Sequence, residues 1–321
     1  MCYMYEQLQS LDHLRLNFNP DGLLLLNITL GVIMFGVALG IRLKGFKTIF
    51  LKPKNIIIGY LSQFLILPLV TFLLTIIFKD FITPGIALGM ILVAACPGGN
   101  ISNFISSLAK GNVELSVSMT ALATISAVIL TPFNFAFWGG LYIKFTEKGT
   151  SGGLLQPLEI DTYQMFISVF ILLGIPLILG MLFAWKFPRI TKKIMKPIQT
   201  ISIIIFMSFV VIAFIKNFDY FIEYIKWVMV IVLIHNAIAL LSGFSFASLF
   251  KIKRRDRRSI TIETGIQNSG LALVLLFNPN IFPDTLPIGG MLFIAAWWGI
   301  WHMISGLSIA YIFSKIPLKI F

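Results

Sequence analysis

The stretch that decides the fold is Glu263–Gly270, which reads Glu-Thr-Gly-Ile-Gln-Asn-Ser-Gly. It lies inside an apolar run, residues 260–277, that is long enough to cross a lipid bilayer. A charged side chain at the centre of a membrane helix costs at least ~2.5–3.5 kcal/mol, so this polar stretch does not face lipid. Its glycines favour a break in the helix. The combination predicts a binding site at mid-membrane depth.

The composition is that of a polytopic membrane protein. Of 321 residues, 58% are hydrophobic and only 12% are charged, whereas soluble domains have about 25% charged residues. The net charge of +12 does not indicate nucleic-acid binding, because the basic residues lie between apolar runs, where the positive-inside rule accounts for them. We expect no disulfide, because Cys2 precedes the apolar runs and Cys96 lies within one.

Nine apolar runs predict an all-α protein with nine membrane-spanning helices. Their approximate bounds are 23–41, 56–78, 85–108, 113–141, 162–185, 198–215, 227–250, 260–277 and 286–313. This arrangement puts 19 of the 25 Lys and Arg residues on one side of the membrane and six on the other. Since cytoplasmic loops carry the basic excess, we predict a multi-pass protein of the inner cell membrane, with the N-terminus outside and the C-terminus in the cytoplasm.

A second interrupted helix is predicted at Cys96–Asn103, which reads Cys-Pro-Gly-Gly-Asn-Ile-Ser-Asn. Pro-Gly-Gly breaks a helix, and the residues that follow place polar side chains beside the break. The run 85–108 passes inward and the run 260–277 passes outward, and each is followed by an uninterrupted run. Two interrupted helices at matching positions of inverted repeats are the best sequence indication of a transporter site. We expect these two helices to cross at mid-membrane depth.

The polar residues in and around the two breaks suit ion binding. A broken helix frees backbone carbonyls, which suit a cation such as Na⁺, and exposes N-termini, which suit an anion. Side-chain oxygens are offered by Gln63, Ser102, Asn103, Ser116, Thr120, Glu263 and Gln267. Ser116 and Thr120 share a helix face, although such hydroxyls often only bond a carbonyl one turn back. Glu263 is the acidic residue placed well inside an apolar run, and an embedded carboxylate indicates function by default.

The two motifs resemble those of the bile acid:sodium symporter family, as do the segments Lys110–Asn112, His235–Asn236 and Trp301–His302. The resemblance covers nearly the whole chain and is to a bacterial homologue in the nine-span form. It implies one transporter unit, residues 1–321, made of a panel and a core. The panel would hold the helices near 23–41, 162–185 and 198–215. The core would hold those near 56–78, 85–108, 113–141, 227–250, 260–277 and 286–313.

The resemblance also implies two sodium sites behind the helix crossing. The positions that match the first site are Ser102, Asn103, Ser116, Thr120 and Glu263. Those that match the second are Gln63, Glu263 and Gln267, with backbone oxygens of Thr264 and Ile266. Substrate would lie between panel and core, near Asn100, Asn268 and His302. One departure is Ala121, which stands after Thr120 where many relatives have a second hydroxyl residue, and which removes one oxygen from the first site.

We therefore expect a secondary active symporter that uses Na⁺ influx to import an organic anion, bile-acid-like or smaller, by alternating access. It would work as a monomer in the lipid bilayer. A proton-coupled carrier in which Glu263 titrates is the alternative within the fold. An intramembrane enzyme is disfavoured, because there is one embedded carboxylate and no His-Glu-x-x-His motif. A channel is disfavoured because crossing broken helices suit an occluding site better than an open pore.

Overall fold

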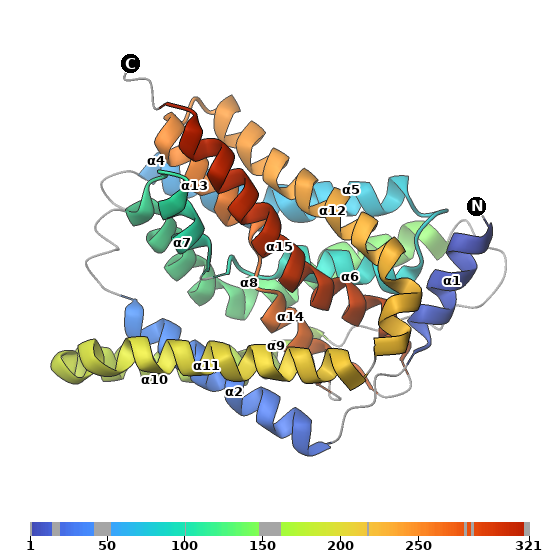
Figure 1. Cartoon of the computed structure of the whole chain (residues 1–321), viewed down its shortest axis with the longest axis horizontal. Coiled ribbons are helices and arrows are strands. Elements are labelled where there is room, and N and C mark those ends of the chain that lie inside the picture. Colours follow the sequence, from blue (N-terminus) through green and yellow to red (C-terminus); the bar gives the residue numbers. More distant parts are fainter. Residues whose placement is uncertain are drawn as a thin grey trace.

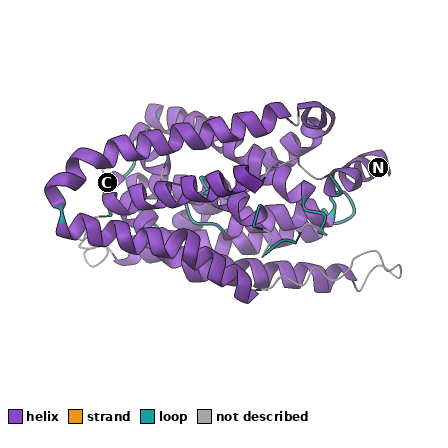
Figure 2. Ribbon diagram, turned by 90° about the horizontal axis from the view of Figure 1, so that it is seen from below, coloured by secondary structure: helices purple, strands orange, loops and turns teal. Residues whose placement is uncertain are grey.

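The computed structural model describes residues 2–14, 20–41, 53–99, 101–147, 162–216, 218–278, 281–283 and 286–317. Within these residues the regular structure is helical throughout, with no strand longer than one isolated bridge (Figures 1 and 2). The helices are α1 Cys2–Asp12, α2 Pro20–Gly40, α4 Pro53–Leu61, η1 Ser62–Ile66, α5 Leu67–Ile77, α6 Pro84–Ala95, α7 Ile101–Leu108, α8 Val113–Glu147, α9 Thr162–Val169, η2 Phe170–Gly174, α10 Ile175–Lys186, α11 Pro188–Lys216, α12 Phe218–Leu249, α13 Arg254–Gly265, α14 Ser269–Leu276 and α15 Gly289–Lys315. The predicted all-α class is confirmed for this part of the chain.

Several helical segments have the length and composition of membrane spans. Five qualify: Pro53–Ile77, Val113–Thr146, Tyr163–Lys186, Ile222–Leu249 and Gly289–Lys315. Asn27–Gly40 and Pro84–Ala95 are shorter apolar helices. These segments make the chain a polytopic membrane protein, while the count of nine spans stays a prediction.

Both predicted helix breaks are present. The run 85–108 forms α6 and α7, and the run 260–277 belongs to α13 and α14. Cys96, after the end of α6, has an extended backbone with ψ 157°, because the residue before a proline avoids the helical region. Asn268 caps α14 by accepting a hydrogen bond from Leu271 N at 3.1 Å.

Two further helices widen into a π-helical turn, which the sequence did not predict. The turn η1 separates α4 from α5, and η2 separates α9 from α10. Each is followed by a proline at the second position of the next helix, Pro68 or Pro176. A proline has no N–H to donate and crowds the carbonyl four residues back. The carbonyl freed by Pro68 belongs to Phe64, and it accepts from Asn134 Nδ2 at 3.1 Å.

Four helix bounds differ from the predicted ones by six residues or more, and one of them is the start of α13 at Arg254 rather than near 260. Helix α11 starts at Pro188 rather than near 198, α12 starts at Phe218 rather than near 227, and α8 continues to Glu147 rather than ending near 141. Apolar runs mark only the part of a helix suited to hydrocarbon, whereas the backbone hydrogen bonds continue into polar sequence. Pro188 at the first position of α11 shows where that helix starts.

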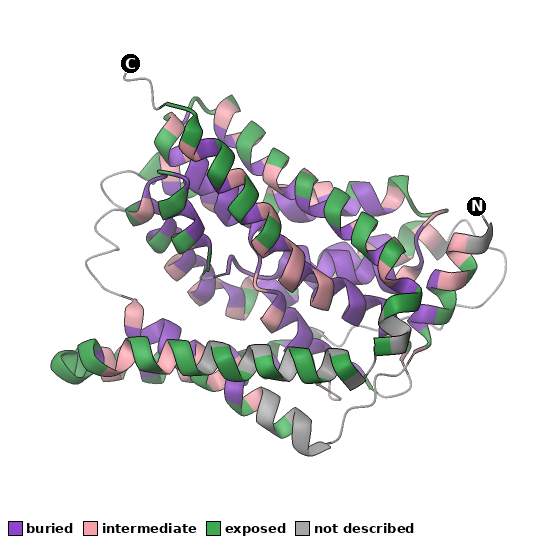
Figure 3. Ribbon diagram, viewed as in Figure 1, coloured by how far each residue is buried: buried purple, intermediate pink, exposed green. Residues whose placement is uncertain are grey.

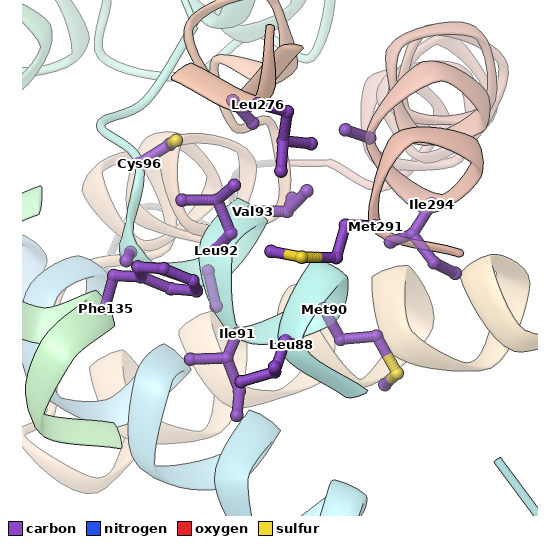
Figure 4. Close-up of a cluster of buried hydrophobic side chains, with 14 of the residues drawn as sticks. Leu88, Met90, Ile91, Leu92, Val93, Cys96, Phe135, Leu276, Met291 and Ile294 are labelled. Atoms are coloured by element: carbon purple, nitrogen blue, oxygen red, sulfur yellow. The ribbon is translucent and has the colours of Figure 1, made fainter. Parts of the chain in front are cut away.

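The hydrophobic core is built around α6. Every residue from Gly85 to Ala95 is buried, so this short helix is enclosed by others on all sides. Figure 4 shows its side chains packed among Phe135 of α8, Leu276 of α14, and Met291 and Ile294 of α15. Figure 3 shows the contrast with α11, whose visible face is largely exposed.

Helices α2, α10 and α11 pack on one another along the lower edge of the molecule in Figure 1. Small residues allow the close approach. A Cβ at Gly180 of α10 would lie 2.8 Å from Phe35 O of α2, and one at Gly36 would lie 3.3 Å from the Gln199 side chain of α11. Gln199 Nε2 also donates to Gly36 O at 2.8 Å. This three-helix group, with α9 and η2 leading into α10, meets the other helices chiefly through α14, which packs on α2 and α9, and through α8, which packs on α9.

Candidate functional site

The two helix breaks lie against each other at the centre of the molecule (Figure 1). Their unwound segments run antiparallel and form an isolated bridge between Gly98 and Gln267. Gly99 N donates to Ile266 O at 2.8 Å, and a second backbone bond of the same length flanks the bridge on its other side. Backbone groups of each break thus satisfy those of the other, as buried polar groups require. We call this arrangement the helix crossing.

Glycine is required at the centre of the crossing because other groups approach it closely. A Cβ at Gly98 would collide with Gln63 Nε2 and would lie 2.8 Å from Glu263 Oε2. The backbone of one broken helix therefore packs directly on the carboxylate side chain of the other. The Pro-Gly-Gly sequence does more than break a helix, because it also leaves room for Glu263.

Three hydroxyl groups surround the Glu263 carboxylate, which is fully buried. Ser102 Oγ of α7 donates to Oε1 at 2.6 Å, and Ser116 Oγ of α8 donates to the same oxygen. Thr120 Oγ1, one turn along α8, lies 3.0 Å from Oε1 and 3.2 Å from Oε2. Among the described residues no lysine or arginine forms an ion pair with this carboxylate. The side-chain groups that bond it, within the described part of the chain, are hydroxyls.

The remaining residue of the first predicted site joins the same group. Thr120 Oγ1 lies 3.2 Å from Asn103 Oδ1. Ser106 Oγ, which the sequence did not single out, lies 3.2 Å from Ser116 Oγ. The five residues proposed for the first site therefore lie together, brought there by α7, α8 and α13.

The residues proposed for the second site lie at the end of α13. Gln63 Nε2 donates to Glu263 O at 3.3 Å, and Gln267 Nε2 donates to Thr264 O at 2.8 Å. Both glutamine side chains are fully buried, and the Oε1 atom of each has no hydrogen-bond partner among the described residues. Buried amide oxygens without a partner are costly. Their presence beside Glu263 indicates a place for a cation, which these oxygen atoms could coordinate.

The donor set of both groups fits a hard cation. Carboxylate, hydroxyl, carboxamide and backbone carbonyl oxygens are the ligands that such cations prefer, and the end of a half-helix is a recurrent Na⁺ site in transporters. Hydroxyl groups can turn their lone pairs toward a cation, because each is both donor and acceptor. Glu263 supplies the negative charge, with its side chain in the first group and its carbonyl in the second.

The residues proposed to contact substrate are less closely grouped. Asn268 is half-buried and its Oδ1 caps α14. His302 of α15 is buried, and its Nδ1 has no partner among the described residues. Gly299, one turn before His302, lies against Ser269 of α14: a Cβ there would be 2.8 Å from Ser269 Oγ. Asn100, the third of these residues, lies outside the described part of the chain.

Two further residues belong to this region and were given no role by the sequence analysis, although Asn236 lies in a segment that resembles the family. Ser62 Oγ lies 2.8 Å from Thr264 Oγ1, and Asn236 Nδ2 donates to Gly265 O at 2.8 Å. The signals were weak: Ser62 is a single hydroxyl beside Gln63, and Asn236 is a single amide in an otherwise apolar helix. The π-helical turn places Ser62 and Gln63 side by side toward α13, which regular helical spacing would not do.

Comparison with known proteins identifies the family of the chain. The family model described as "Sodium Bile acid symporter family" matches residues 27–224. The chain is 32% identical to the uncharacterized sodium-dependent transporter YocS of Bacillus subtilis, over 90% of this chain and 83% of that protein. It is 29% identical to the probable sodium/metabolite cotransporter BASS1 of Arabidopsis thaliana, over 77% of this chain and 58% of that protein. Human P3 protein is 28% identical, over 74% and 47% respectively. The chain therefore belongs to the sodium bile acid symporter family and is a sodium-coupled membrane transporter rather than an enzyme.

Proposed function

We propose that this transporter is a symporter that imports an organic anion together with two Na⁺ ions by alternating access. The observation that carries this proposal is the Glu263 carboxylate, fully buried beside the helix crossing and bonded by three hydroxyls. An ionised carboxylate accepts hydrogen bonds and does not donate, so three hydroxyl donors suit its charged form. A buried charge of this kind is matched by a bound cation.

Ser102, Asn103, Ser116, Thr120 and Glu263 would hold the first ion. Gln63, Glu263 and Gln267, with the carbonyls of Thr264 and Ile266, would hold the second. Bringing these oxygens to an ion requires the carboxamides of the two glutamines to turn, since their nitrogen atoms now face the carbonyls. Because Glu263 takes part in both sets, the two ions would bind as a coupled pair.

The substrate would bind where α14 begins, between the α2, α10 and α11 group and the remaining helices. The first N–H groups of α7 and α14 lie at the helix crossing, and a helix N-terminus attracts an anion. Asn268, His302 and Asn100 are the residues proposed to contact the substrate. Movement of the three-helix panel against the rest would open this region to one side of the membrane at a time.

The central experiment measures uptake into proteoliposomes of candidate organic acids, including a bile salt and smaller carboxylates. Uptake of the transported acid should require Na⁺ and should carry net positive charge if two ions accompany a monovalent anion. Uptake that is unchanged when choline replaces Na⁺ contradicts the proposal. Uptake driven in choline by a pH gradient would instead support a proton-coupled carrier.

The proposed topology has nine spans, with the N-terminus outside and inverted repeats around the crossing. It rests on the distribution of basic residues and on the opposite directions of the two broken helices. In a Cys2→Ser background, Lys79→Cys should react with an impermeant thiol reagent from outside, and Lys253→Cys should not. Both positions are exposed in the structure, so access to the reagent depends on sidedness. The reverse pattern would overturn the orientation.

A further inference from the structure

Each of the carbonyl groups at the end of α13 accepts a hydrogen bond from a different residue. A helix C-terminus leaves its last carbonyls without partners inside the helix. Here Glu263 O and Thr264 O accept from the two glutamine side chains. Ile266 O accepts from the backbone of the other broken helix. The carbonyl between them, Gly265 O, accepts from Asn236 Nδ2 at 2.8 Å.

Asn236 reaches this carbonyl from α12, which lies flush against α13. A Cβ at Gly265 would lie 2.6 Å from Leu240 Cγ, and a Cβ at Gly243 would lie 2.8 Å from Thr264 Cβ. Asn236, Leu240 and Gly243 follow one another at helical spacing, so one face of α12 runs along the end of α13. Asn236 is fully buried, and its Oδ1 has no partner among the described residues.

The close approach of α12 leaves little room for a side chain at 265, and glycine is the residue whose backbone is least constrained. A free carbonyl at 265 could turn toward a cation in competition with its neighbours. The peptide group is planar, so fixing Gly265 O also fixes the orientation of the 265–266 peptide group. The hydrogen bond from Asn236 supplies that constraint.

We propose that Asn236 is a positioning residue for the second sodium site. It holds the carbonyl of Gly265 toward α12, so that the ion is met by the carbonyls of Thr264 and Ile266, each of which keeps a second lone pair beside its present hydrogen bond. This inference rests on the proposed function. It assigns a role to a residue that does not contact the ion itself, and it places that residue on a helix from which no ligand is expected.

The test compares Asn236→Leu with Thr71→Val. Leucine is close to asparagine in size but leaves Gly265 O without its donor. Thr71→Val is the matched control, because it removes an equally buried hydrogen bond of 2.8 Å, from α5 to His235 Nε2, on the adjacent residue of α12. Neighbouring residues of a helix do not face the same way. Purified proteins in detergent are titrated calorimetrically with NaCl and with LiCl, and their thermal midpoints are recorded.

Asn236→Leu should weaken Na⁺ binding about tenfold or more and reduce the preference for Na⁺ over Li⁺, since selectivity depends on ligand geometry. Thr71→Val should lower the thermal midpoint while Na⁺ affinity and the Na⁺/Li⁺ ratio stay within about twofold of wild type. Asn236→Ala is a milder second variant. Its smaller side chain leaves space for a water that can donate to Gly265 O, and it should give an intermediate loss of affinity.

Wild-type Na⁺ affinity and selectivity in both Asn236 variants would overturn the inference, and so would an equal loss of Na⁺ affinity in Thr71→Val. The outcome is separable from that of the proposed function. If wild-type protein binds no Na⁺, the sodium sites themselves are wrong. If wild type binds Na⁺ and the Asn236 variants match it, only the positioning role is wrong.

Discussion

Glu263 and Asp12 are both buried acidic residues, but they are held in different ways. Asp12, at the end of α1, is only 6% exposed and accepts from Gly85 N at the start of α6 at 3.0 Å. Glu263 accepts from three side-chain hydroxyls. A backbone N–H can only donate, whereas a hydroxyl can donate or accept. The surroundings of Asp12 therefore suit a fixed tie between helices, and those of Glu263 suit exchange of hydrogen bonds for a cation.

The glycines near each carboxylate extend the comparison. A Cβ at Gly85 or at Gly290, near the start of α15, would collide with Asp12 Oδ1. A Cβ at Gly98 would collide with Gln63 Nε2 and crowd Glu263. Both acidic groups thus sit where backbone approaches closely. One is at the N-terminal ends of two helices, and the other is at the break in the middle of two helices.

The largest expected effect is that of Glu263→Gln. The change keeps the shape of the side chain and removes the charge proposed to balance both ions, whose attraction is much stronger in a low-dielectric interior than in water. Sodium affinity should fall by at least tenfold, a loss above about 1.4 kcal/mol, as measured by calorimetric titration. Asp12→Asn should leave Na⁺ affinity unchanged. Wild-type affinity in Glu263→Gln would remove the distinction between the two carboxylates.

The next-largest effect distinguishes the surroundings of Glu263 from those of Asp12 by changing a glycine beside each carboxylate. Gly98→Ala should weaken Na⁺ binding and also destabilise the protein by about 1–3 kcal/mol, the usual cost of overpacking. Gly290→Ala should destabilise the protein through the Asp12 contact while Na⁺ affinity stays near that of wild type. Gly140→Ala in α8 is the control, because a Cβ there meets nothing within 4 Å. Thermal midpoints and Na⁺ titrations of the three variants check this order, and equal Na⁺ affinities in the first two would contradict it.

Much of the site could be predicted because its chemistry is unusual for a membrane helix. A carboxylate in an apolar run, and Pro-Gly-Gly in another, are conspicuous whatever their surroundings. Ser116 and Thr120 could be placed on one face from their spacing alone. The structure brings them to Glu263, in the group that was expected.

Other parts could not be predicted because they depend on contacts between helices. The register of α12 against α13 decides which carbonyl Asn236 bonds. The periodicity of a single helix gives no information about that register. The π-helical turn at Ser62–Ile66 arises where Pro68 removes a backbone donor, and Asn134 of α8 completes it. The extension of α11 back to Pro188 was missed because its basic first turns lack the apolar pattern by which spans are recognised.

A smaller effect concerns pH and tests the Asp12 side of the comparison. Burial raises the pKa of Asp12 to about 7, against the hydrogen bond from Gly85 N that lowers it. Between pH ~4 and ~7 the folded protein therefore keeps a proton that the unfolded chain releases, so the free energy of unfolding falls as pH rises through this window. Each unit of pKa difference corresponds to about 1.4 kcal/mol.

Asp12→Asn has no such proton to release. Relative to this variant, the thermal midpoint of wild type should fall between pH 5 and pH 7.5 and then level off. Differential scanning fluorimetry across that range measures the difference directly. Parallel curves for the two proteins would show that Asp12 does not titrate in this window.

The smallest expected effect is that of Asn268→Ala, which tests how far the helix crossing serves substrate rather than sodium. Asn268 follows Gln267 by one residue, yet its Oδ1 caps α14 by accepting from Leu271 N. Loss of an N-cap costs about 1 kcal/mol, so the thermal midpoint should fall slightly. Substrate binding at saturating Na⁺ should weaken, because the N-terminus of α14 is proposed to face the anion, while Na⁺ binding without substrate should stay close to wild type. Since coupling between equilibrium affinities is reciprocal, a variant that weakens substrate only through Na⁺ would show both losses. Abolished Na⁺ binding in Asn268→Ala would place this residue with the sodium ligands and away from substrate.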